Sequence, residues 1–522
     1  MSRGRLARLG LVAAAALGVA GVTAAVFLIR AGGSGPSNWP VNFELGSSDN
    51  GVLFQFAGDV FHGRPLDWSF SPQVFVFPEI PISLLAYLLA GGGVQLYYLV
   101  VAMINVVILF VAFYGVIRAI YSEDAFVSCL VRALLASSAL VLLPLVGTVS
   151  LFDFQLAPTY YYGMYLALAA WPLLYVSRRR VALVLVGLGL ALIVASNPLT
   201  LIFALPALIV LGLVRRIAMG LRAVLWPLIV TVGVFAVAAG IRLALFSGLQ
   251  GTSPLTYIDA SQLPQRVTTL AVNFGIAAHS DITLLLLLIG FGAAVWLFVF
   301  AARRLIRVLR HREVLEKRDW ILLYYALVPV TGLLAAVALL ILNYLYLWPI
   351  LVAPLAFAPL MLPAPQLRRV GFATSGVLVV ALIVTFIVVA PASPARYLAY
   401  RDQETRCLDS ELPTGMDVGY AGYFDARRIE LTSTRSLLLI QVDYHGRSPY
   451  LWLTNRDYPT EHLGRFFFVN SASGQLTITS HEITTLVGAP DRRVVCPDGS
   501  ELLIYTKNAK LAKIDARYHQ TR

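Results

Sequence analysis

The chain has 522 residues, of which 58% are hydrophobic and only 13% are charged, and its mean hydropathy is +0.76. Soluble globular proteins contain about 25% charged residues, so this composition excludes a soluble globule, and its apolar content excludes a disordered chain. The net charge of +12 does not indicate nucleic-acid binding, because most basic residues lie at the ends of apolar runs. The sequence therefore predicts a membrane protein.

About eleven apolar runs approach the length of roughly 20 residues that a helix needs to cross a bilayer. They lie near residues 10–29, 94–117, 126–147, 160–177, 181–195, 199–214, 223–246, 282–302, 320–342, 345–363 and 370–391. The first run follows arginine residues and could be a signal peptide, but its length and the lack of a clear A-x-A site favour an uncleaved anchor. Ser196-Asn197-Pro198 interrupts residues 181–214, which indicates a short hairpin in preference to a broken helix of the kind that marks binding sites.

The basic residues orient these predicted spans. With a cytoplasmic N-terminus, twenty Arg and Lys residues fall in inner segments, including a basic amphipathic stretch at 303–318. The outer loops before residue 392 contain only Arg64 and Arg266, with Arg30 and Arg242 near outer span ends. An odd number of crossings places the residues after 392 on the outer face. The Arg-rich, Lys-poor composition indicates a bacterial source and thus the bacterial inner (cytoplasmic) membrane.

The last part of the chain has the composition of a soluble domain. We expect an all-α polytopic membrane domain at 1–391 and an extracytoplasmic α+β domain at 392–522. Apolar patterns predict strands at 437–442, 450–453, 466–469, 476–479, 493–496 and 502–505, and short helices at 420–429 and 481–486. Cys407 and Cys496 form a disulfide candidate, since an oxidising compartment permits a bridge there. No CxxC pair or histidine cluster predicts a metal site.

The loop at residues 31–81 is too long and too aromatic for a simple connector. Helical spacing between Asp49 and Asp59 is followed by a turn at His62-Gly63-Arg64-Pro65, and then by aromatic residues and prolines up to Phe77-Pro78-Glu79. This pattern predicts a helix on the membrane surface followed by an extended segment. Eight carboxylates lie in the outer loops, so acid–base chemistry is expected on that face: Glu44, Asp49, Asp59, Asp67, Glu79, Asp153, Asp259 and Asp281.

This layout resembles the GT-C superfamily of polytopic glycosyltransferases, which includes protein O-mannosyltransferases and lipid A aminoarabinose transferases. In that family the first span precedes a long outer loop with an early acidic residue, a helix, a Gly-x-Pro turn and a Pro-rich stretch. Asp49, Gly63-Arg64-Pro65 and residues 71–81 stand in those places, and Asp153 occupies the acidic position of the next outer loop. The chain departs from the family at Ser48-Asp49-Asn50, where paired acids are common.

A second departure concerns phosphate binding. Asn343-Tyr344-Leu345 lacks the Arg of a late motif found in some relatives, which puts phosphate contacts at that position in doubt.

The resemblance implies transfer of a sugar from a polyprenyl-phosphate donor in the bilayer to a glycan, lipid or protein acceptor. The sequence lacks a Walker loop and a G-x-G-x-x-G segment after a strand, which agrees with a donor that is not a nucleotide. The reaction needs a carboxylate that takes the acceptor proton and a cation that stabilises the leaving phosphate. The catalytic candidates are Asp49 as general base and Asp153 as its helper or as a group that positions the acceptor. The substrate-binding candidates are Arg64, Arg242 and Arg266 for phosphate and Tyr161 for sugar. No cofactor is required, although a divalent cation is compatible with this chemistry.

Each candidate also has a purely structural interpretation. Asp49 suits the N-terminal cap of the helix that follows, and Asp153 suits a loop without function. Arg242 suits a side chain that extends to the lipid headgroups, Arg266 a solvated loop charge, and Tyr161 an interfacial aromatic belt.

Two other functional classes remain open. A transporter or flippase of a lipid-linked glycan would place ionisable residues deep in its spans, and these spans contain little besides Arg242 and the polar Asn105. A non-catalytic assembly factor would use the outer domain to recruit a partner, and the aromatic residues of the first loop would then serve packing.

Overall fold

The computed structural model describes most of the chain. The described residues are 3–32, 48–71, 74–121, 126–146, 155–157, 161–176, 180–246, 264–265, 267–268, 272, 281–311, 315–338, 347–362, 393–399, 401, 403–442, 453–455, 464–469, 478–506 and 511.

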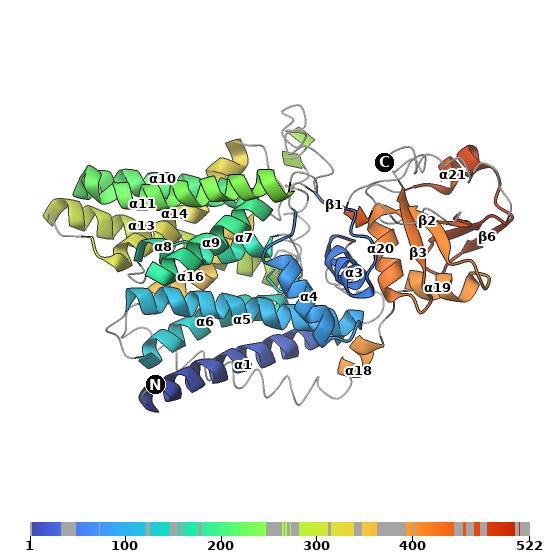
Figure 1. Cartoon of the computed structure of the whole chain (residues 1–522), viewed down its shortest axis with the longest axis horizontal. Helices are drawn as coiled ribbons and strands as arrows, with labels where there is room; N and C mark the ends of the chain where they lie inside the picture. The colour runs from blue at the N-terminus through green and yellow to red at the C-terminus, as the bar shows by residue number, and fades with distance from the viewer. Residues whose placement is uncertain are drawn as a thin grey trace.

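Long apolar helices fill one end of the molecule and lie roughly along its longest axis (Figure 1). α1 packs against α5, α5 against α6, and α10 against α14. The helices are α1 (Arg3–Gly32), α5 (Val94–Ile120), α6 (Phe126–Val146), α7 (Tyr162–Ala170), α8 (Leu173–Val176), α9 (Arg180–Ser196), α10 (Leu199–Met219), α11 (Leu221–Ile241) with its π-helical continuation η2 (Arg242–Phe246), α13 (Asp281–His311), α14 (Lys317–Ala338), α15 (Trp348–Leu351) and α16 (Ala353–Met361).

Six of the described helices contain segments long and apolar enough to cross a bilayer, so the chain is a membrane protein. These segments are Leu6–Leu28, Val94–Ile120, Phe126–Pro144, Leu199–Met219, Val224–Phe246 and Leu284–Val308. The expected number of about eleven spans is not established. The run at 160–177 is divided at Trp171-Pro172 into α7 and α8, α9 and α15–α16 are shorter than a span, and the run at 370–391 lies outside the described residues.

The first loop, residues 33–93, joins α1 to α5 and contains α3 (Ser48–His62), β1 (Trp68–Ser69) and α4 (Glu79–Leu89). α3 packs on α4 on one side and on α20 (Tyr423–Thr432) on the other. Figure 1 shows α3 between the long helices and the C-terminal sheet. The first loop therefore contacts both ends of the molecule.

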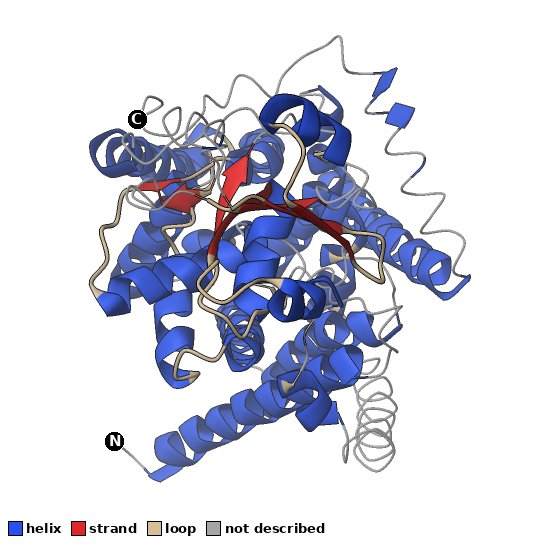
Figure 2. Cartoon of the chain, turned by 90° about the vertical axis from the view of Figure 1, so that its right-hand side faces the viewer, coloured by secondary structure: helices blue, strands red, loops and turns tan. Residues whose placement is uncertain are grey.

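The C-terminal region, residues 393–511, is built around a five-stranded sheet with the order β3-β2-β5-β7-β6. β3, β2 and β5 are parallel, whereas β5, β7 and β6 are antiparallel. Figure 2 shows the strands in red among the helices. The elements are α18 (Ser393–Leu398), α19 (Gln403–Glu411), β2 (Val418–Gly422), α20, β3 (Leu438–Val442), β4 (Thr454–Asn455), β5 (Phe466–Val469), α21 (Ser480–Val487), β6 (Arg492–Val495) and β7 (Glu501–Ile504).

Helices cover both faces of this sheet, as the alternation of its side chains requires. Phe467 and Leu503 point to the face where Ile483 of α21 packs. Phe468 and Leu439 point to the opposite face, together with apolar residues of α19 and α20. The pair β1–β4 is a separate two-stranded sheet that joins the first loop to the C-terminal region. Cys407 of α19 and Cys496, next to β6, form a disulfide bond with their Cα atoms 5.9 Å apart.

Candidate functional site

Helix α3 is defined at both ends by local sequence. Its first turn contains Asp49, whose negative charge is favourable near the positive end of the helix dipole. Its C-terminus is closed by Gly63 with φ of 65°, by a hydrogen bond from the Arg64 N–H to the Asp59 carbonyl (2.9 Å) and by one from the Gly63 N–H to the Val60 carbonyl (3.3 Å). This is a Schellman motif, and it fixes where the helix ends. The helix and turn predicted from the sequence are confirmed.

Asp49 lies at the contact between the first loop and the C-terminal region. Its carboxylate is partly buried and accepts a hydrogen bond from the hydroxyl of Tyr423, the first residue of α20. Burial raises the pKa of Asp49, and the Tyr423 hydrogen bond offsets part of that rise because it stabilises the charged form. A raised pKa brings a carboxyl group closer to the range in which it exchanges protons near neutral pH.

A second acid of α3, Asp59, is almost completely buried and lies in the same interface, near the C-terminal end of α3. It accepts hydrogen bonds from Trp68 Nε1 at 3.0 Å and from Asn455 Nδ2 at 2.9 Å. The exposed Arg64, a phosphate candidate, lies 3.5 Å from Asp59 Oδ1. Asp59 thus connects α3, β1 and β4, and its carboxylate also forms an ion pair with Arg64.

Between these two acids, polar side chains join α3 to α20. Gln55 of α3 donates a hydrogen bond to Glu430, which also pairs with the buried Arg427 at 2.7 Å. Arg427 in turn donates to Thr454 of β4. Buried charges need such pairing to offset the cost of desolvation, so the contact between the first loop and the C-terminal region is a specific interface.

A third acid, Glu79, lies at the start of α4 and is 5% exposed. Its Oε1 accepts a hydrogen bond from the backbone N–H of Gly163 in α7, 2.7 Å away. Burial raises the pKa of Glu79 to about 8, against smaller opposing effects of hydrogen bonds from backbone N–H groups. Glu79 borders a small cavity of about 10 Å³, which has room for roughly one water molecule. The other residues that line this cavity are Ile82, Ser83, Val101, Asn105 and Tyr162.

The break at Ser196-Asn197-Pro198 forms a turn between two separate helices, α9 and α10. Asn197 Oδ1 accepts a hydrogen bond from the Leu199 N–H at 3.1 Å, as in a helix cap. Ser196 accepts two hydrogen bonds from the first loop, one at its carbonyl from the Val74 N–H and one at Oγ from the Phe77 N–H, both at 2.9 Å. The extended segment of the first loop is therefore anchored on this turn.

The phosphate candidate Arg242 contacts the end of α9, next to the same turn. Arg242 lies at the start of η2, and its Nη1 donates to the carbonyl of Ala195, 2.7 Å away. Ala195 is in the last turn of α9, where carbonyl groups lack partners within the helix. Arg242 thus completes the end of α9 near the site where the first loop is anchored.

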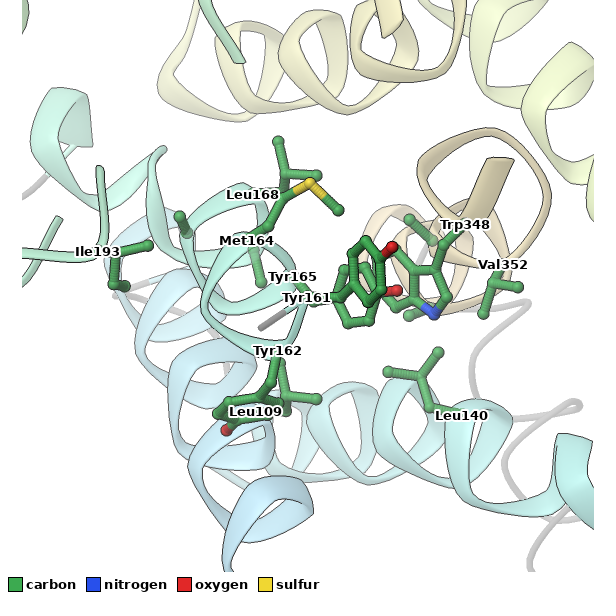
Figure 3. Close-up of a cluster of buried hydrophobic side chains, with 14 of the residues drawn as sticks. Leu109, Leu140, Tyr161, Tyr162, Met164, Tyr165, Leu168, Ile193, Trp348 and Val352 are labelled. Atoms are coloured by element: carbon green, nitrogen blue, oxygen red, sulfur yellow. The ribbon is translucent and has the colours of Figure 1, made fainter. Parts of the chain in front are cut away.

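Tyr161, the sugar candidate, is 3% exposed and lies in a buried aromatic cluster before α7. Figure 3 shows Tyr161 beside Tyr165 and Trp348, whose rings are stacked with centroids 3.7 Å apart. The neighbouring Tyr162 points from α7 to α5, where its hydroxyl donates to the Asn105 carbonyl at 2.7 Å.

The candidates predicted from the sequence thus have different surroundings. Asp49 contacts Tyr423, Arg64 lies beside Asp59, and Arg242 contacts Ala195. Asp153 and Arg266 lie outside the described residues. Within the described residues, no group of three or more His, Cys, Asp or Glu side chains is placed to hold a metal ion.

Two residues of this region were not assigned a role from the sequence. Glu79 was counted among the outer carboxylates, and the signal for it is an acid directly after Pro78 at the start of an apolar helix. Tyr423 had no local signal, because its partner Asp49 lies 374 residues earlier in the chain.

Comparison with known proteins gives a distant structural likeness. No protein-family model and no curated protein matches the chain in sequence. Among solved structures, the chain is similar to the crystal structure of an oligosaccharyltransferase from Archaeoglobus fulgidus in complex with Zn and sulfate. The sequence identity is 13% and the TM-score is 0.48, and the alignment covers 86% of this chain and 67% of the other. A likeness at this level assigns no activity.

Proposed function

We propose that the chain is an integral-membrane glycosyltransferase of GT-C type that transfers a sugar from a polyprenyl-phosphate donor to an extracytoplasmic acceptor. The observation that carries the proposal is Asp49, a partly buried carboxylate in the first turn of α3, in the loop that follows the first apolar segment. This is the position at which the sequence resembles the GT-C superfamily. The burial that raises the pKa of Asp49 also favours its use as a base, since catalytic carboxylates work best when their pKa lies near the operating pH.

The proposed reaction is a substitution at the anomeric carbon of the donor sugar. The acceptor oxygen forms the new glycosidic bond, the bond from the anomeric carbon to the lipid phosphate breaks, and the polyprenyl phosphate leaves with the electron pair. The acceptor proton passes to a carboxylate oxygen of Asp49, with Asp153 as helper. Arg64, Arg242 and Arg266 are the proposed cations for the phosphate, and Tyr161 the proposed sugar contact. A divalent cation is compatible with this reaction.

The proposal includes a topology. The N-terminus is cytoplasmic, and the first loop and the domain at 392–522 lie outside the cytoplasm of a bacterial cell, where lipid-linked sugars replace nucleotide sugars as donors. The contact between α3 and α20 supports this arrangement, because residues in direct contact share one side of the membrane. The acceptor is a glycan, a lipid or a protein that reaches the same side.

The test is sugar transfer by purified full-length protein in liposomes that contain labelled polyprenyl-phosphate sugar. Asp49→Asn keeps the size of the side chain and removes the base, so transfer should fall by about 10²-fold or more. Asp67→Asn is the matched control, because Asp67 is an exposed carboxylate of the same loop. Unchanged transfer by a folded Asp49→Asn protein would remove the assignment of the base.

A non-catalytic assembly factor is the second candidate, and it is favoured by the dense polar contacts between α3 and α20. In that case Asp49 serves only the interface. The wild-type protein would then transfer no sugar, while Asp49→Asn would loosen the C-terminal region and make it more sensitive to limited proteolysis.

A further inference from the structure

The mechanism proposed above does not use Glu79, although it is among the most buried acids of the described chain. The first N–H groups of a helix lack partners within the helix, and a side chain at the N-terminal cap usually accepts from one of them. Tyr161, which precedes α7, makes no such bond. Glu79 accepts from the Gly163 N–H instead, from a position 84 residues earlier in the chain.

The contact is close enough to require glycine at position 163. A Cβ atom there would lie 2.9 Å from Glu79 Oε1 and 2.9 Å from Pro78 Cδ, so any larger residue would push the first loop away from α7. The loop cannot move freely in response, because Val74 and Phe77 are bonded to Ser196 just before this point.

Helix α4 continues the connection toward α3. One turn after Glu79, the Ser83 hydroxyl donates to the Leu53 carbonyl of α3 at 2.7 Å and lies 2.8 Å from the Tyr97 hydroxyl of α5. α3 begins with the turn that contains Asp49, and α7 directly follows the segment that contains Asp153. Polar residues of α4 therefore connect α3, which bears the proposed base Asp49, to α7, which follows Asp153 in the chain.

We propose that Glu79 is a positioning residue that holds the start of α7 against the first loop, and that this joint requires a neutral carboxyl group. The inference rests on the proposed function only in that the first loop contains Asp49 and the chain before α7 contains Asp153, the two proposed acids of the reaction. The hydrogen bond, the close approach at Gly163 and the small cavity beside Glu79 carry it.

The surroundings of Glu79 favour its neutral form. Among the described residues, the polar groups that face it are Ser83 of α4, Asn105 of α5, Tyr162 and the Gly163 N–H of α7, and its own backbone N–H, and none of these is a cation. Burial raises the pKa of Glu79 to about 8 because an anion there has lost its water without gaining a positive partner. Backbone N–H groups stabilise the carboxylate only in part, so ionisation leaves a poorly solvated charge at this contact, and the joint should weaken in alkaline solution.

The test compares Glu79→Gln with Glu79→Ala in the full-length protein. Glutamine is neutral and keeps an oxygen for the Gly163 N–H, so Glu79→Gln should transfer sugar at pH 7 within about threefold of wild type and should lack the decline of activity above pH 8. Glu79→Ala removes the acceptor and should transfer at least tenfold more slowly at every pH. Asp67→Asn should keep the alkaline decline of the wild type.

A second measurement does not depend on activity. Hydrogen exchange of a peptide that covers residues 161–166, compared between variants at one pH, should be at least tenfold faster in Glu79→Ala than in wild type and nearly unchanged in Glu79→Gln. Equal exchange in all three proteins, or an alkaline decline that persists in Glu79→Gln, overturns the role of Glu79. If the wild type transfers no sugar, the proposed enzyme fails, and the exchange data alone decide whether Glu79 holds α7.

Discussion

The Tyr423 hydroxyl donates a hydrogen bond to the carboxylate of Asp49, so a residue of the C-terminal region completes the surroundings of the proposed base in the first loop. The contact is made at the start of α20, which begins directly after β2. The sheet therefore sets the position of Tyr423, and the hydrogen bond from Tyr423 orients the Asp49 carboxylate. A site assembled in this way depends on both ends of the molecule.

Tyr423→Phe should raise the pKa of Asp49, because the hydrogen bond that opposes the effect of burial is lost. A base with a higher pKa is protonated over more of the acidic range, so the acid side of the pH profile for sugar transfer should move to higher pH. Below the pKa of Asp49, transfer by Tyr423→Phe should therefore be slower than transfer by the wild type, and the difference should shrink as pH rises. A uniform loss at every pH would indicate that Tyr423 serves folding and does not tune Asp49.

Sequence patterns predicted the elements of the fold that neighbouring residues in the chain determine. The helix from Ser48 to His62 and its end at Gly63 follow from apolar spacing and from a glycine that adopts a positive φ. The strands at 438–442 and 466–469 follow from apolar runs. The expected helix at 420–429 begins later, at Tyr423, because Val418–Gly422 form the central parallel strand β2. The two glycines of VGYAG lower its strand propensity, so the local sequence does not predict this strand, and pairing with β3 and β5 stabilises it.

The site could be predicted less well, because its contacts join distant parts of the chain. Asp49 stood out as an acid after the first span, but nothing near it in sequence indicates Tyr423. Likewise, Glu79 is recognisable as an acid beside a proline, while its partner at Gly163 depends on how α4 packs near α7. Sequence periodicity describes one element at a time, whereas burial of a charge is a property of several elements together.

Glu79 should make the stability of the protein fall as pH rises. Its pKa is raised from 4.5 to about 8 on folding, so between these values the unfolded chain releases a proton that the folded protein still holds. This contribution is fully present below pH 4.5 and is lost as pH rises to about 8, by about 1.4 kcal/mol per pH unit and by at most about 5 kcal/mol in all. The difference in unfolding midpoint between wild type and Glu79→Gln in detergent, measured from pH 4.5 to 8, should follow this course. A difference that does not depend on pH would contradict the buried, neutral carboxyl group.

Asp59→Ala should destabilise the contact between the first loop and the C-terminal region. The substitution removes the hydrogen bond from Trp68 Nε1 and one of the hydrogen bonds from Asn455 Nδ2, which also donates to the Pro65 carbonyl, and should cost about 3 kcal/mol. Asp59→Asn keeps one acceptor oxygen and should cost less, and Asp67→Ala, at an exposed position, should change the free energy of unfolding by at most about 0.5 kcal/mol. Thermal unfolding of the full-length protein measures these effects. The interface would be unimportant for stability if Asp59→Ala and Asp67→Ala had equal midpoints.

The bond between Cys407 and Cys496 should stabilise the C-terminal region and report the side of the membrane on which it lies. It closes a loop across a sequence separation of 89 residues, so its removal should cost about 3–5 kcal/mol through the greater freedom of the unfolded chain. Reduction of the wild type, or replacement of both residues by serine, should make the region at 403–506 more sensitive to protease in the full-length protein, and reduction should have no further effect on the double variant. Disulfides persist in oxidising compartments, so in intact cells the two thiols should react with maleimide only after reduction. Thiols that react without reduction would place the C-terminal region in the cytoplasm and contradict the proposed topology.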